Sequence, residues 1–243
     1  RRRKLKYLAP LLVLVAVSIA GFYFLDWAER LEAAPATRAA PERPVLPQAE
    51  RTASLPALNL PADDAAHGSG MEWWYYSGIL DAQPGGARYS FHVAVFVANS
   101  LVKHTVMHVA LTDLQTGQRY MRQGRTAGMP AKLSQSGFDF QQEGWRVAGT
   151  GPSHSIKANF DDVALVLQLQ DDQPVVAHRA AGSQAPGLLD FGESGISYYY
   201  SRPRMAAQGE VRLGKMDAQQ VRGPVWFDHQ WGDFDVTRLG WNW

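Results

Sequence analysis

The sequence contains no cysteine. This absence excludes disulfides, thiolate metal sites, a cysteine nucleophile and a lipid attached through an N-terminal cysteine. The chain also lacks a strong charge of either sign, because 24 Lys and Arg residues oppose 23 Asp and Glu residues. Bulk charge therefore gives no case for nucleic-acid binding. With 243 residues, 46% of them hydrophobic, the chain can build one sizeable core or two small ones.

An apolar run follows a basic flank at the N-terminus. Residues 1–6 carry five Arg and Lys side chains, and residues 7–25 are almost entirely apolar. About 20 apolar residues cross a bilayer as a helix, and a basic flank stays in the cytoplasm. We expect a membrane anchor with the rest of the chain on the periplasmic or extracytoplasmic side. A signal peptide cleaved after Ala20, giving a secreted protein, is the alternative.

Beyond this run the sequence predicts a tether and then a β domain. Residues 26–60 are rich in Ala and Pro and indicate a flexible tether. Short strand-like segments follow at intervals of roughly 8–12 residues, which is typical of an antiparallel sandwich or barrel. We expect strands at 72–81, 89–99, 105–114, 119–125, 137–142, 145–150, 155–159, 162–170, 197–201, 209–213 and 224–231.

The stretch HGSGMEWWYYSG, residues 67–78, places four large aromatic side chains next to a carboxylate. Because strand side chains alternate between faces, Glu72 shares a face with Trp74 and Tyr76. A carboxylate among aromatic rings is poorly solvated, so we expect its pKa to rise and Glu72 to act as a general acid. A glutamate at a strand edge, paired with an arginine, is the alternative.

Two later aromatic clusters lie at residues 197–204 and 223–232. In the second, one strand face carries Phe227, His229 and Trp231, and the other carries Trp226, Asp228 and Gln230. His229 would exchange a proton or bind a ligand, and Asp228 would orient a neighbour or cap a loop. In the first, Tyr198, Tyr200 and Arg202 either face a cavity or form cross-strand pairs in a strand that ends at Pro203.

The spacing of the candidate residues gives little support to a metal site or to a serine hydrolase. On a strand, the four-residue separation of His104 and His108 spans roughly 13 Å, too far for one ion. His67, Glu72, Asp228 and His229 lack an accepted ligand spacing, so we expect no metal. The GESG stretch at 192–195 falls short of a nucleophile elbow, which leaves a secreted hydrolase as a weak alternative.

The motifs EWWY, YYSRPR and WFDHQWG, at 72–75, 199–204 and 226–232, together resemble the carotenoid 1,2-hydratase (hydroxyneurosporene synthase) and AttH-like family of lipocalin-like proteins. The resemblance covers about residues 61–243. It implies two consecutive lipocalin-like barrels, the first at 61–218 and the beginning of a second at 219–243. It also implies that part of the fold lies beyond residue 243.

The resemblance implies cofactor-free addition of water to an isoprenoid double bond. His229 and Trp231 match the family's His-x-Trp pair, whereas its later Tyr-x-Asp pair would lie beyond residue 243. We expect His229, Trp231, Glu72 and Asp228 to be catalytic, and the ligand to contact Trp74, Tyr76, Tyr198, Tyr200, Arg202 and Phe227. The expected partners are an apolar isoprenoid or lipid and the membrane. A non-catalytic lipid carrier or chaperone remains the alternative to an enzyme.

Overall fold

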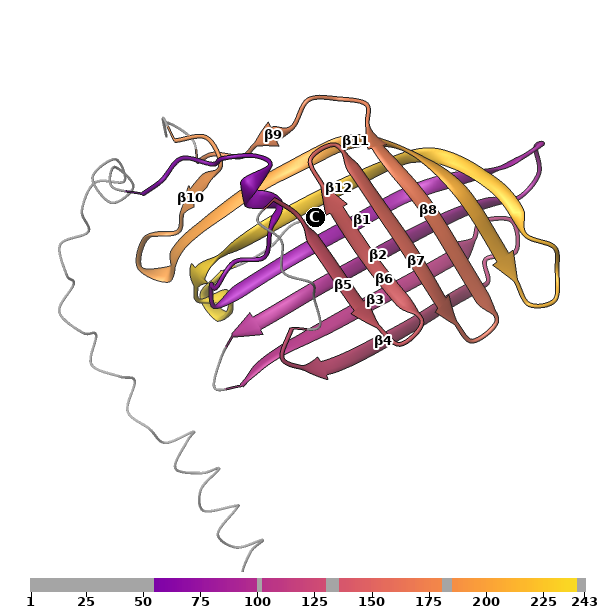
Figure 1. Cartoon of the computed structure of the whole chain (residues 1–243), viewed down its shortest axis with the longest axis horizontal. Coiled ribbons are helices and arrows are strands. Elements are labelled where there is room, and N and C mark those ends of the chain that lie inside the picture. The colour runs from indigo at the N-terminus through magenta and orange to yellow at the C-terminus, as the bar shows by residue number, and fades with distance from the viewer. Residues whose placement is uncertain (1–54, 100–101, 130–135, 181–184, 240–243) are drawn as a thin grey trace, which may run out of the picture. The chain divides into compact units, whose positions relative to one another are not determined.

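The sheet of this protein curls into a nearly closed antiparallel barrel (Figure 1). The computed structural model describes residues 55–99, 102–129, 136–180 and 185–239. The strand order is β4-β3-β2-β1-β12-β11-β8-β7-β6-β5, and β9 and β10 pair with β11. The strands are β1 (Met71–Gln83), β2 (Arg88–Asn99), β3 (Lys103–Asp113), β4 (Arg119–Ala127), β5 (Phe138–Gln142), β6 (Trp145–Thr150), β7 (Ser153–Phe160), β8 (Val163–Asp171), β9 (Val176–Ala177), β10 (Leu188–Asp190), β11 (Gly195–Leu213) and β12 (Gln219–Phe234).

The structure confirms most of the predicted strands and their alternation. On β1, Trp74, Tyr76 and Leu80 are fully buried, whereas Ile79 on the opposite face is 39% exposed. On β12, Phe227 and His229 are fully buried and the outward Trp226 is 39% exposed. Period-two alternation of this kind is what a strand with one face on the core requires.

The predicted end of a strand at Pro203 is wrong. Residues 197–201 and 209–213 belong to one strand, β11, which continues through Pro203 with a shift of register between Arg202 and Met205. A proline has no N–H to donate, and a bulge is one of the few places in a sheet where none is needed. The bulge also changes the neighbour of β11, because its pairing with β8 begins only at Met205.

The segment expected to begin a second domain forms β12. This strand pairs with β1 on one side and β11 on the other, so it lies in the middle of the sheet. Residues 214–218, at the expected border, are the short connection between β11 and β12. The division of the whole protein into domains stays a prediction.

Side chains join the two ends of the sheet, β4 and β5. The Arg122 guanidinium on β4 lies 2.8 Å from Asp161 in the β7–β8 turn. Gly124 lies against the amide of Gln142, since a Cβ on that glycine would come within 2.4 Å of the amide nitrogen. These contacts take the place of a backbone ladder between β4 and β5, and the barrel is therefore nearly closed.

The segment before β1 crosses one end of the barrel (Figure 1). It contains the 3-10 turn η1 (Ala62–Asp64), and its Leu58 and Leu60 pack on the core. Several hydrogen bonds fasten it to the wall, and two of them lie at its start and at its 3-10 turn. The Tyr198 hydroxyl donates to Pro56 O at 2.7 Å, and Gly151 N donates to Asp64 Oδ2 at 2.7 Å. This end of the interior is thus covered by residues 56–67.

The helices in the described ranges are the 3-10 turns η1, η2 (Gly192–Ser194) and η3 (Val236–Arg238). None of these has the length and apolar character needed to span a membrane. The apolar run at 7–25, where we expect the anchor, lies outside the described residues.

Trp74 is the largest fully buried side chain of the core, and its ring lies 4.6 Å from that of Phe140 across the barrel. We expect Trp74→Ala to lower the free energy of unfolding by about 3–5 kcal/mol, because it leaves a cavity between opposite walls. Trp226→Ala, on the outer face of β12, should cost less than about 1 kcal/mol. Urea denaturation followed by circular dichroism measures both. Equal losses in the two variants would contradict this assignment of the core.

Candidate functional site

Glu72 is the centre of a buried polar cluster. Its side chain is only 1% exposed, and it accepts three hydrogen bonds from two histidines. Glu72 Oε1 lies 2.8 Å from His67 Nδ1 and 2.9 Å from His229 Nε2. Glu72 Oε2 accepts from the backbone N–H of His67 at 2.8 Å. Every approach to this carboxylate therefore comes from a group that can donate a proton.

The sheet register brings Glu72 and His229 together. Trp231 is opposite Glu72 and His229 is opposite Trp74, so all four side chains lie on the inner face of β1 and β12. Glu72 reaches His229 diagonally, as side chains of neighbouring strands do. The His229 ring lies 4.5 Å from the Trp74 ring and 4.6 Å from the Trp231 ring. The imidazole is thus held between two indoles.

His67 closes the cluster from the segment that crosses the barrel end. Its ring stacks on Trp231 at 4.0 Å with an interplanar angle of 3°. Its side chain is 24% exposed, and its Nε2 lies 3.7 Å from Asp63 Oδ1. Tyr198 stacks on the indole of Trp231 at 5.2 Å. His67 is therefore the member of the cluster that solvent or a ligand reaches first.

The structure corrects the expected pKa of Glu72. Burial raises this pKa, as the sequence predicts, but hydrogen bonds from His229 and His67 outweigh burial and hold it below its ordinary value. Burial lowers the pKa of His229, and the neighbouring Glu72 opposes that effect. The sequence correctly placed Glu72 among aromatic rings and drew attention to His67 and His229 as possible metal ligands, but it did not predict that both imidazoles bond to this carboxylate.

A second group of charges lies directly behind His229. Its Nδ1 is 3.2 Å from the Tyr200 hydroxyl, which in turn donates to Asp64 Oδ1. Asp64 is fully buried and paired with Arg202, whose Nη2 lies 2.9 Å from Asp64 Oδ1. Arg202 also contacts Asp171 at the end of β8. The predicted ligand-binding residues Tyr200 and Arg202 thus belong to this hydrogen-bonded network.

Asp228, expected to be catalytic, lies on the opposite face of β12 from His229. It is buried and accepts hydrogen bonds from the hydroxyls of Ser201 and Tyr199. His178 Nε2 lies 2.6 Å from Ser201 Oγ. Because the Ser201 hydroxyl donates its hydrogen bond to Asp228, its oxygen can only accept a hydrogen bond from His178. The histidine then acts as a donor instead of a base, which is the reverse of a catalytic triad.

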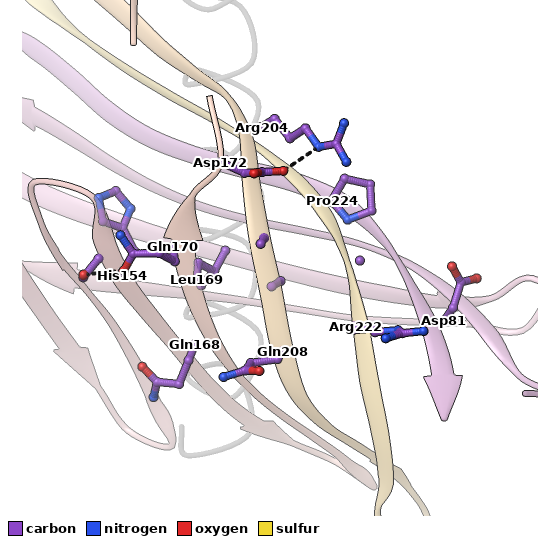
Figure 2. A pocket seen from close by; sticks show the side chains of 14 residues that line it. Asp81, His154, Gln168, Leu169, Gln170, Asp172, Arg204, Gln208, Arg222 and Pro224 are labelled. Atoms are coloured by element: carbon purple, nitrogen blue, oxygen red, sulfur yellow. Dashed lines mark hydrogen bonds and ion pairs between the residues drawn. The ribbon is translucent and has the colours of Figure 1, made fainter. Parts of the chain in front are cut away.

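The remaining predicted ligand contacts, Trp74, Tyr76 and Phe227, point into the barrel and are fully buried among other rings. The Tyr76 hydroxyl bonds His154 Nδ1 at 2.8 Å, and burial lowers the pKa of His154 to about 3. A pocket of about 670 Å³ lies over β8, β11 and β12. Its lining includes Arg204, Arg222 and several glutamines (Figure 2). It is lined by none of the expected ligand contacts, so their role stays a prediction.

His67, Glu72 and His229 are the described residues that could hold a metal ion, since their ligand atoms lie within 4.8 Å of one another. Both imidazole nitrogens, however, point at the same oxygen of Glu72 at 2.8 and 2.9 Å, which are ordinary hydrogen-bond distances. Protons between these atoms already satisfy the cluster. The expectation of no metal stays a prediction.

Three members of the network went unnoticed in the sequence: Asp64, Asp171 and His154. Asp64 stands at the start of the folded part next to Asp63, and Asp171 stands in an Asp-Asp pair after a strand. Such positions are typical of caps and turns. Nothing in the spacing of these residues indicates that they meet Arg202 or Tyr76, because Asp64, Asp171 and His154 lie on elements distant in the chain from those partners.

A depressed pKa for Glu72 has a consequence for stability at acid pH. The group stabilises the fold above its ordinary value of 4.5, and that contribution is lost as the pH falls through the lower folded value. We expect Glu72→Gln to lower the free energy of unfolding at pH 7 and to flatten its decline below about pH 4.5. Urea denaturation between pH 3 and 7 measures this. Glu143→Gln, at an exposed position, is the control and should leave the curve unchanged.

Solved structures of similar fold include the following two proteins. One is an AttH protein from Nitrosomonas europaea, with a TM-score of 0.63 and 23% sequence identity over 75% of this chain and 58% of that one. The other is kievitone hydratase from Nectria haematococca, with a TM-score of 0.59 and 16% identity over 75% of this chain and 54% of that one. The chain thus spans less than two thirds of either protein. A comparison with curated proteins gives no match.

The family comparison is more specific than the structural likeness. The AttH-like family model matches residues 51–243, which include the whole barrel and all residues of the Glu72 cluster. The expectation of an AttH-like barrel is therefore confirmed, and the chain belongs to the AttH-like family.

Proposed function

We propose that this protein adds water to a carbon–carbon double bond of an apolar, isoprenoid-like ligand, with Glu72 and His229 supplying the proton. The observation that carries the proposal is the direct contact of these two groups, 2.9 Å apart, inside an aromatic cluster. The similar fold of a protein described as a hydratase supports it. Action on a carotenoid is the finer form of the proposal and rests on the family resemblance.

The reaction needs one proton and one water molecule. The proton shared by Glu72 and His229 moves to the less substituted alkene carbon, and the electron pair of the double bond forms the new C–H bond. A tertiary cation remains. A water oxygen then bonds to the cationic, more substituted carbon, and one proton of that water returns to the Glu72–His229 pair. The pair is thereby restored and no redox cofactor is consumed.

The rings around the pair suit a cationic intermediate. The faces of Trp231, His67 and Tyr198 form a stack next to Glu72, and an indole face attracts a cation by about 0.5–2 kcal/mol. The same stack includes the partly exposed edge of His67. An apolar ligand would therefore approach along this stack, with the alkene end directed at the pair.

We expect His229→Gln to lower hydration of a polyene by about 100-fold or more, because it removes the proton-donating ring and a positioned acid contributes 10²–10⁴. The assay uses the full chain, a polyene with a terminal isopropylidene group in detergent, and H₂¹⁸O. Mass spectrometry measures the labelled alcohol. His108→Gln, outside the cluster on β3, is the matched control and should retain activity.

Three outcomes separate the alternatives. Labelled alcohol from the parent chain that persists in His229→Gln would contradict the role of His229. Tight binding of the polyene without any alcohol would support a lipid carrier or chaperone. Failure to bind or convert the polyene would overturn the proposed substrate class.

We also propose that the barrel acts outside the cytoplasm, held at the membrane by the N-terminal segment. The basic flank and the apolar run at 7–25 support this. A reporter enzyme that needs disulfides, fused after residue 60, should be active in a bacterial host. The same fusion without residues 1–25 should be inactive. Activity of both fusions, or of neither, would contradict the proposed location.

A further inference from the structure

A continuous line of hydrogen bonds runs through the barrel from Glu72 to Arg202. It passes from Glu72 Oε1 to His229 Nε2 at 2.9 Å, and from His229 Nδ1 to the Tyr200 hydroxyl at 3.2 Å. It continues from that hydroxyl to Asp64 and from Asp64 to Arg202. All five side chains are at most 3% exposed. Bulk solvent therefore does not reach the side chains along this line.

At the Asp64 end of the line, the direction of the hydrogen bonds is fixed, because Asp64 can only accept them. Arg202 donates to both Asp64 oxygens, at 2.9 and 3.2 Å, and the Gly151 N–H donates to Oδ2 at 2.7 Å. Neither donor has a lone pair with which to accept a proton from Asp64. Asp64 is therefore an acceptor toward its remaining partner, Tyr200.

Tyr200 carries a single hydroxyl proton, which it donates in the hydrogen bond to Asp64. The phenol oxygen can then act toward His229 only as an acceptor. The contact at 3.2 Å is satisfied when His229 Nδ1 carries a proton and donates it. If His229 Nδ1 were bare, two lone pairs would face each other inside the barrel with no proton between them.

A proton on Nδ1 of His229 limits the protonation states that are possible at Nε2, on the other side of the ring. Glu72 Oε1 and His229 Nε2 also need one proton between them at 2.9 Å. Since Nδ1 is already protonated, this proton is either the second proton of an imidazolium or the proton of a carboxylic acid. In both forms it is acidic, because burial lowers the pKa of His229 and the hydrogen bonds from the two imidazoles lower that of Glu72. A neutral ring with its only proton on Nε2 would instead leave Glu72 without an acidic partner.

We propose that Tyr200 and Asp64 are positioning residues that fix the Nδ1–H form of His229 and so place an acidic proton between His229 and Glu72. This deepens the proposed function, on which its catalytic meaning rests. The hydrogen positions themselves do not depend on any activity, so they can be tested without substrate.

Other charged groups near the line do not reverse its direction. Arg202 is shared between Asp64 and Asp171, so this group of three has one positive and two negative charges. His67 donates to the same oxygen of Glu72 from the segment that crosses the barrel end. Burial holds His154, beyond Tyr76, in its neutral form. None of these groups offers Tyr200 a second proton.

The test is ¹⁵N NMR of the histidine rings in the labelled full chain at neutral pH, without substrate. The ¹⁵N shifts of Nδ1 and Nε2 report which nitrogen carries a proton, and His229→Gln identifies the His229 signals. We expect protonated Nδ1 in the parent chain. In Tyr200→Phe the acceptor is gone, so the ring should turn to the neutral form with its proton on Nε2, donated to Glu72.

Tyr198→Phe is the matched control. Tyr198 lies two residues away on the same strand face but donates to Pro56 O, outside the line. Its loss should leave the His229 shifts unchanged. A bare Nδ1 in the parent chain would overturn the proposal without any variant. Protonated Nδ1 that persists in Tyr200→Phe would also overturn it, because a purely structural role for Tyr200 would not move the proton.

Discussion

A buried carboxylate needs donors on every side, and the interior of this barrel is arranged around that requirement twice. Glu72 obtains its donors from His67 and His229, and Asp64 obtains its donors from Arg202, Tyr200 and the backbone of Gly151. Leaving either carboxylate unpaired would cost several kcal/mol. The two sets of contacts hold β1, β11, β12 and the crossing segment in one arrangement.

The two carboxylates also depend on each other, because His229 and Tyr200 lie between them. The Asp64–Arg202 ion pair makes Asp64 the acceptor of the Tyr200 hydroxyl. That bond in turn makes the Tyr200 oxygen the acceptor toward His229. The aromatic rings around His229 exclude water and so keep that direction from being lost. Stability and the proposed chemistry therefore rest on the same buried groups. Replacing one of them changes both.

The sequence predicted the parts of this structure that follow from local pattern. Alternation along 72–80 and 226–231 placed Glu72, Trp74, His229 and Trp231 on inner faces, as found. It failed where the chain departs from regular pairing, as at Pro203, and where distant segments meet. His67 lies only five residues before Glu72, but His229 and the partners of Asp64 come from elements far apart in the chain, and no local pattern contains those pairings. The lowered pKa of Glu72 was missed for the same reason.

The register shift in β11 divides that strand between two sets of neighbours. Beyond Met205 it is joined to β8 by a regular ladder, and before Arg202 it pairs with the short β9 and β10. At the boundary, β8 ends at Asp171 and is tied to β11 by the Arg202 side chain. The barrel wall therefore has a seam where two ion pairs, Arg202–Asp171 and Arg204–Asp172, and one backbone hydrogen bond, from Asp172 N to Arg204 O at 3.0 Å, take the place of a regular ladder. Separating the wall there would break these side-chain pairs and one backbone hydrogen bond, whereas separating it beyond Met205 would break a whole ladder.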